Sequence, residues 1–234
     1  MMERILTAEL LDDDLGTPKE VQQSLDDLWR INRWLGGVHS NLHLLESVFE
    51  RTGADCLRVL DVGAGDARLA KSLRQALSRQ QQNAEFVALD RRQSHLRNRR
   101  SDAEALPRVA ADVFELPFAV NSFDVVLCNL FFHHFSGERA QLLLQRLASV
   151  ASRAVIINDL ERGVLAYLFI RAAYPFAQSR ITRHDGPASV RQAYTSAELA
   201  SLVAAAGFSD FTVERLAPFR LGLTLWKSSP GERD

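Results

Sequence analysis

One stretch limits the possible folds of this chain more than any other. It is VLDVGAGDARLA, residues 59–70, in which an apolar run ends in an acidic residue, turns through Gly63 and Gly65 and continues as a helix-forming segment. A strand that delivers its carboxyl end to a glycine turn at a helix N-terminus is a place where α/β proteins hold a polar ligand. Arg68 stands where the dinucleotide motif GxGxxG has its third glycine, and this argues against a nicotinamide cofactor.

Composition and charge exclude several classes of protein. The 234 residues are 47% hydrophobic and 24% charged, which is typical of a globular chain with one large core. A net charge of −1 gives no bulk attraction to nucleic acids, so we expect a small-molecule partner and no nucleic acid. The segment Arg91–Arg100 holds five arginines, but acidic residues follow at once and aromatic residues are absent, which favours a solvated helix face over an RNA site.

The N-terminus and the cysteines bear on cellular location. Residues 1–14 have no long apolar core after a basic start, unlike a secretory signal, and no run approaches the roughly 20 apolar residues of a membrane span. Cys56 and Cys128 lie in or beside apolar runs and are expected to be buried thiols. These features favour a reducing, cytoplasmic location without an integral membrane segment.

Hydrophobic periodicity divides the chain into alternating helices and strands. A capping box at Thr17–Glu20 starts a helix that stops at Gly36, and a second helix follows over about Asn41–Arg51. Expected strands are the apolar runs 59–62, 85–90, 109–112, 122–129, 154–159, 211–216 and 221–226. Strands that alternate with helices predict an α/β, doubly wound, mostly parallel sheet.

Three details of the later helices are also predicted. Ser136 is expected to cap the helix that runs to about Val150, and Thr195–Glu198 forms a second capping box. His184–Pro187 combines glycine and proline and is expected to be a turn.

Polar residues end successive strands of the expected sheet. Asp61, Asp90, Asp112 and Asn129 each come at the end of an apolar run, and the carboxyl ends of parallel strands meet at one edge. Asp90 lies about 20 to 30 residues beyond the glycines, the spacing at which a carboxylate accepts hydrogen bonds from two ribose hydroxyls.

Four motifs in this order resemble those of the class I, Rossmann-like S-adenosylmethionine-dependent methyltransferases of small-molecule biosynthesis. They are the glycine loop, the acid at Asp90, the D-x-x-x-L-P-F segment 112–118 and the FDVV strand 122–129; Ala67 replaces the family's third glycine. The resemblance implies a seven-stranded sheet with an antiparallel final strand, an N-terminal helical cap over residues 1–52, and a methyltransferase domain over 53–234. It also implies S-adenosylmethionine as cofactor, bound by Asp61, Gly63, Ala64, Gly65, Asp90, Arg91, Asp112, Val113, Asn129 and Leu130.

Two histidines follow the fourth strand in the segment FFHHF, residues 131–135. His133 or His134 is the leading candidate for a general base, although a purely structural role explains either equally well. Adjacent side chains on a helix point about 100° apart, so we expect at most one of the two to face the pocket. No metal is expected, because His39 and His43, which are four residues apart, have no third ligand in the sequence.

In the methyltransferases that this chain resembles, insertions after the fifth strand form the acceptor pocket. Here that insertion is expected around residues 160–190, and its apolar side chains favour a lipophilic acceptor. A packed helix, a homodimer contact or a membrane-surface helix explains the same composition. The substrate candidates of the cap and the insertion are Trp34, Arg162, Tyr167, Tyr174 and His184.

The predicted function is methyl transfer to a small, largely apolar acceptor, at an oxygen of a phenol, enol or carboxylate. The fourth strand ends in Asn129-Leu-Phe-Phe and not in Asn/Asp-Pro-Pro-Tyr/Phe, which argues against methylation of amino groups. Two alternatives stay open: C-methylation of a quinol or polyketide ring, and a cofactor-binding regulatory protein without turnover.

Overall fold

The computed structural model describes residues 2–96 and 106–227, and a seven-stranded sheet runs through them. Its strand order is β3-β2-β1-β4-β5-β7-β6, and β7 alone runs antiparallel to its two neighbours. The strands are β1 (Cys56–Val62), β2 (Asn83–Asp90), β3 (Arg108–Ala110), β4 (Phe123–Asn129), β5 (Ala151–Leu160), β6 (Phe211–Leu216) and β7 (Arg220–Trp226). The predicted doubly wound fold, with its antiparallel closing strand, is confirmed.

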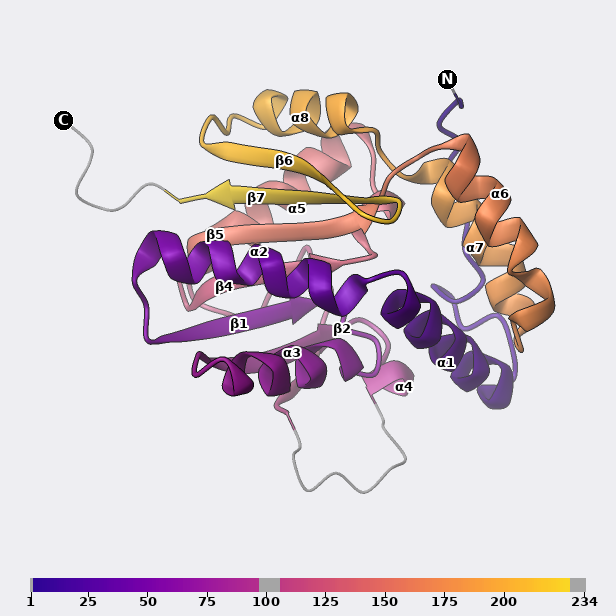
Figure 1. Ribbon diagram of the computed structural model, residues 1–234, viewed down its shortest axis with the longest axis horizontal. Helices are drawn as coiled ribbons and strands as arrows, with labels where there is room; N and C mark the ends of the chain where they lie inside the picture. Colours follow the sequence, from indigo (N-terminus) through magenta and orange to yellow (C-terminus); the bar gives the residue numbers. More distant parts are fainter. Residues whose placement is uncertain (1, 97–105, 228–234) are drawn as a thin grey trace.

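Helices cover both faces of the sheet (Figure 1). The helices α2 (Gly37–Thr52) and α3 (Arg68–Arg79) bury leucines such as Leu45 and Leu73 against one face. The other face packs against α5 (Gly137–Val150) and α8 (Ser196–Ala205). Two apolar cores, one on each side, therefore hold the sheet and fix the positions of its strand ends.

A third group of helices gathers beyond the carboxyl ends of the parallel strands (Figure 1). It consists of α1 (Pro18–Trp34), α6 (Val164–Ala172) and α7 (Arg180–Gln192), and α7 packs against both of the others. Val21 and Leu25 of α1 bury their side chains against Ile181 of α7. The short helices α4 (Gln93–Leu96), η1 (Phe132–His134) and η2 (Tyr174–Phe176) complete the described elements.

The two predicted capping boxes are confirmed, and one helix start is wrong. Thr17 and Thr195 each accept from the amide three residues on, and the glutamate there reaches back to the cap amide. The second helix begins at Gly37 and not near Asn41, because Gly36 takes a left-handed conformation (φ 68°) that turns the chain directly from α1 into α2.

Two further local predictions need correction. Residues 184–187 do not form a turn but lie inside α7, where Gly186 lets Ile170 of α6 approach closely. Ser136 precedes α5 as expected, but its side chain makes no capping hydrogen bond.

The remaining expectations have mixed outcomes. Helix α4 occupies only residues 93–96 of the arginine-rich segment, and positions 97–100 lie outside the described residues. Cys128 is buried as predicted, whereas Cys56 is exposed because it starts β1 at the sheet's amino edge. None of the described helices has the length and apolar character needed to cross a bilayer.

A buried guanidinium joins the sheet to the helices at its carboxyl edge. Arg220 of β7 is 1% exposed and donates to the Oδ1 of Asn32 at 2.6 Å, the Oδ1 of Asn158 at 3.3 Å and the carbonyl of Leu35 at 3.1 Å. Burial lowers its pKa to about 10, so the side chain stays charged at neutral pH. One cation thus connects β7, β5 and the end of α1.

We predict that Arg220→Leu destabilises the protein by about 3 kcal/mol or more, because it leaves buried oxygens without a donor. Thermal denaturation should show a melting temperature lower by roughly 6 to 12 °C. Arg215→Leu on neighbouring β6 is the matched control, since Arg215 is 71% exposed and pairs with Glu161 at the surface. Equal effects of the two substitutions would contradict the structural role of Arg220.

Candidate active site

A cavity of about 500 Å³ opens where the strand order reverses, between β1 and β4. Open α/β sheets bind their ligands at this position, because the loops after the two central strands leave in opposite directions. The loops after β1, β2, β3 and β4 all reach the cavity, and α1, α6 and α7 close it from the other side. Predicted site residues that line it are Gly63, Ala64, Gly65, Asp90, Arg91, Asp112, Val113, Asn129, Leu130, His133 and His134.

The glycine loop is shaped by close packing. Gly63 has a φ of 68°, and a Cβ built on it would lie 2.7 Å from the Cγ of Phe131. Any side chain at this position would collide with the ring and strain the backbone. Ala67 takes a left-handed φ of 62° immediately before α3, the conformation that a third glycine would adopt without strain.

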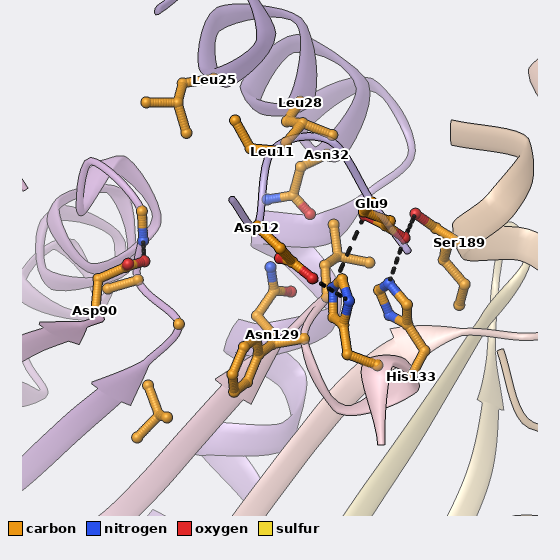
Figure 2. A pocket seen from close by; sticks show the side chains of 18 of the residues that line it. Glu9, Leu11, Asp12, Leu25, Leu28, Asn32, Asp90, Asn129, His133 and Ser189 are labelled. Carbon is orange, nitrogen blue, oxygen red and sulfur yellow. Dashed lines mark hydrogen bonds and ion pairs between the residues drawn. The ribbon is translucent and has the colours of Figure 1, made fainter. Parts of the chain in front are cut away.

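Asp90 connects the loop after β1 to the end of β2. Its Oδ2 accepts from the amide of Gly65 at 2.9 Å and its Oδ1 from the amide of Arg92 at 2.8 Å. The Oδ1 also lies 3.6 Å from the Nδ1 of His95. An ionised carboxylate has about four lone-pair positions, so part of its accepting capacity remains for a ligand. The carboxylate lies at one end of the cavity (Figure 2).

Asp61 has a different place from the one predicted. It is 1% exposed, is absent from the cavity wall, and its Oδ2 has no hydrogen-bond partner among the described residues. Burial and the nearby Asp90 carboxylate raise the pKa of Asp61 to about 7. Asp61 therefore lies behind the glycine loop as a carboxyl group that is half-protonated near neutral pH.

The ends of β3 and β4 provide polar groups as expected. Asp112 accepts from the amide of Phe114 at 2.9 Å, and Asn129 accepts from the Nδ2 of Asn41 at 2.8 Å. Leu130 has a φ of 51° and directs the chain from β4 toward the histidine pair.

The two histidines face the cavity together, so the expectation that at most one would do so is wrong. Their rings stack with centroids 4.3 Å apart and planes inclined by 28°, at the end of the single 3₁₀ turn η1. The Nδ1 of His133 lies 2.7 Å from the Oδ1 of Asp159, and the Nδ1 of His134 lies 3.1 Å from the Oδ2 of Asp12. Each imidazole is therefore oriented by its own carboxylate.

Charge around His133 is unusual. Burial by itself would lower its pKa, but the carboxylates of Asp159 and Glu9 outweigh that effect and raise the pKa to about 10. This is not the near-neutral histidine expected of a general base. The two carboxylates instead stabilise a positive charge between them.

Residues 9–14, here called the N-terminal strap, form a side of the site that the sequence analysis missed. Glu9, Leu11 and Asp12 line the cavity. The carbonyl of Asp12 accepts from the Nε of Arg92 at 2.8 Å, and the Oδ1 of Asp14 lies 2.8 Å from the Nε2 of His95. The acidic run 12–14 and the basic residues after β2 were the signal that could have predicted this contact.

The other side of the strap is attached to α7. Asp185 accepts from the amides of Leu10 and Leu11 at 2.9 and 3.0 Å. The carboxylate of Glu9 accepts from the hydroxyl of Ser189 at 2.6 Å and from the amide group of Gln192. Glu9 and His133 therefore stand together at the end of the cavity opposite Asp90 (Figure 2).

Comparison with known proteins identifies the domain. Residues 59–153 match the family model described as a methyltransferase domain. Residues 59–153 therefore carry a methyltransferase domain. Methyltransferases of this fold use S-adenosylmethionine as their cofactor. No curated protein sequence matches the chain.

Solved structures show the same fold at low sequence identity. The plantazolicin methyltransferase BamL, in complex with a triazolic desmethylPZN analog and SAH, is 14% identical over 89% of this chain and 91% of its own, with a TM-score of 0.67. A SAM-dependent methyltransferase from Aquifex aeolicus is 17% identical over 90% and 98%, with a TM-score of 0.57. Magnesium protoporphyrin IX methyltransferase from Synechocystis PCC 6803, with bound SAM, is 16% identical over 83% and 81%, with a TM-score of 0.52.

The structure does not bring the predicted substrate residues of this methyltransferase to the main cavity. The guanidinium of Arg162 is buried and donates to the carbonyls of Met2 and Ala193 and to Glu198 at 2.6 Å, which leaves it no free face. Trp34 and Tyr174 line a second, smaller cavity of about 290 Å³. Tyr167 and His184 line neither of the two cavities described.

We predict a pH effect on the stability of the cofactor-free methyltransferase that depends on Asp61. Its folded pKa of about 7 lies above the unfolded value of 3.8, so the native state binds the extra proton between these pH values. This stabilisation is complete below pH 3.8 and is lost as pH rises through 7, an effect of about 4 kcal/mol.

Asp61→Asn removes that titration. Urea unfolding at pH 5, 6.5 and 8 should show the variant gaining stability relative to the wild type as pH rises. A stability difference that stays constant across this range would contradict a raised pKa at Asp61.

Proposed function

We propose that this methyltransferase transfers the methyl group of S-adenosylmethionine to an oxygen of a small, largely apolar acceptor, such as a phenol, an enol or a carboxylate. One observation carries the proposal: the cavity has two chemically different ends. The glycine loop and Asp90 stand at one end, and Glu9 and His133 at the other (Figure 2). A cofactor bound at the first end would direct its methyl group toward an acceptor at the second.

The cofactor roles follow the strand ends. In this proposal Asp90 and Arg91 hold the ribose hydroxyls, and Asp112 and Val113 bind the adenine. The methionine moiety lies along the loops after β1 and β4, and Asp61 supports the first of them from behind. The residues of those two loops are Gly63, Ala64, Gly65, Asn129 and Leu130.

The acceptor side is largely apolar. Leu28 of α1 lines the cavity together with Phe169 and Ile170 of α6, whereas Leu25 lies over Gly65. We propose that the cap, residues 1–52, and the insertion around 160–190 form the acceptor pocket between them. The names of the similar enzymes, which act on plantazolicin and on magnesium protoporphyrin IX, support a small-molecule acceptor.

The chemistry requires positioning and the loss of one proton. The sulfonium already activates the methyl group, so aligning the nucleophile with the carbon–sulfur bond is the main task and lowers the barrier by up to about 7 to 11 kcal/mol. A hydroxyl must also lose its proton to become a good nucleophile. Glu9, His133 and His134 are the ionisable groups at the acceptor end. Because His133 already carries a proton, we assign this step to Glu9 and His134.

We predict that Asp90→Asn weakens binding of S-adenosylmethionine by about tenfold to a hundredfold, because it loses charged hydrogen bonds to the ribose. Isothermal titration calorimetry measures the dissociation constant. Asp124→Asn is the matched control, since Asp124 also accepts from a backbone amide, that of Arg58 at 2.9 Å, but lies at the start of β4. Wild-type affinity in the Asp90 variant would refute the ribose assignment.

We predict that His134→Gln lowers kcat at least about a hundredfold and leaves cofactor affinity unchanged, because only the acceptor end is altered. The assay screens a panel of phenols, quinols and carboxylic acids for methyl transfer and then compares variants on the best acceptor. His43→Gln, in a surface pair with Glu214, should keep wild-type turnover. Full activity of the His134 variant would remove His134 from the chemical step.

A further inference from the structure

The acceptor end of the cavity gathers three side chains whose atoms suit a metal ion. The Nε2 of His133 lies 3.6 Å from one carboxylate oxygen of Glu9, and the Nε2 of His134 lies 3.9 Å from the other. All three ligand atoms lie within 4.8 Å of one another. Ligands about 2.1 Å from a shared ion are roughly 3.0 to 3.4 Å apart, so small side-chain movements would close the site.

One atom of the cluster, the Nε2 of His133, lacks a hydrogen-bond partner within the described part of the chain. His133 is 3% exposed, and its Nε2 makes no hydrogen bond to any described residue. A buried polar atom in this state costs free energy unless a ligand satisfies it. The atom points toward Glu9, across a gap too long for a hydrogen bond and too short for a water molecule between them.

Hydrogen bonds and ion pairs from neighbouring residues orient all three side chains, as metal sites require. Asp159 and Asp12 occupy the Nδ1 positions of His133 and His134, which leaves both Nε2 atoms directed at the same place. A metal ion bound there would displace the proton from the Nε2 of His133. Ser189 and Gln192 hold the carboxylate of Glu9. Histidines whose second nitrogen donates to a carboxylate are the usual arrangement around bound transition metals.

The local charge also favours a cation. Glu9, Asp12 and Asp159 place three carboxylates around two imidazoles. The facing cation is Arg4, whose guanidinium is engaged by the carbonyls of His133 and Phe135. A divalent ion would balance the excess negative charge.

We propose that Glu9, His133 and His134 bind a divalent first-row transition metal through two imidazole nitrogens and one carboxylate. Such a set leaves coordination positions open, and the cavity they face is the one that contains the acceptor end. This inference rests on the proposed function for its role: the ion would bind the acceptor's oxygen and lower the pKa of its hydroxyl, so that the three residues act through the ion and the proton passes to water. It explains why two adjacent histidines share one carboxylate.

The test is metal binding by the full chain, stripped of metal and free of cofactor and acceptor. Isothermal titration with Zn²⁺, and visible absorption with Co²⁺ followed by displacement with Zn²⁺, should show one ion per chain. Glu9→Gln and His134→Gln should each weaken binding a hundredfold or more. Asp12→Asn, which keeps all three ligands, should weaken it about tenfold to a hundredfold.

His43→Gln is the control, because His43 and Glu214 form an ordinary surface pair 3.1 Å apart. Circular dichroism checks that each variant is folded. Absence of stoichiometric binding, or binding that Glu9→Gln and His134→Gln leave unchanged, would overturn the proposal. A chain that binds metal but not S-adenosylmethionine would support this site and refute the proposed function. A chain that binds S-adenosylmethionine but not metal would refute this site and leave the proposed function standing.

Discussion

The hydrogen bond from the amide of Gly65 to the carboxylate of Asp90 is the contact on which the site depends. It joins the loop after β1 to the end of β2, on one side of the point where the strand order reverses. With Phe131 packed against Gly63 from the end of β4, the loop is held from both neighbouring strands. The cavity therefore has a rigid floor, and differences in specificity must arise from the segments that cover it.

The covering segments are held mainly by charge. The strap reaches from α7 to the loop after β2, where Asp12 to Asp14 meet Arg92 and His95. Each contact is partly exposed, and such contacts contribute little singly. Together they hold the strap in place and keep the carboxylate of Glu9 beside the two histidines. The acidic run thus has a structural role that composition alone does not reveal.

Most of the residues that we propose for the cofactor could be placed at the cavity from the sequence, with Asp61 as the exception, and those that we propose for the acceptor largely could not. Asp90, Asp112 and Asn129 are found because a parallel sheet brings consecutive strand ends to one edge, so that local patterns determine their positions. The strap contacts join residues 80 to 180 positions apart and leave no periodic signal. Arg162 was misjudged for a related reason, because a guanidinium that ties segments together looks the same in sequence as one that binds a ligand.

A crystal structure with S-adenosylhomocysteine tests the central claim most directly. We expect ribose hydroxyls on the carboxylate of Asp90, adenine beside Asp112 and Val113, and the sulfur directed at the end that holds Glu9 and the two histidines. A nucleoside bound away from Asp90, or a sulfur that faces away from that end, would contradict this claim.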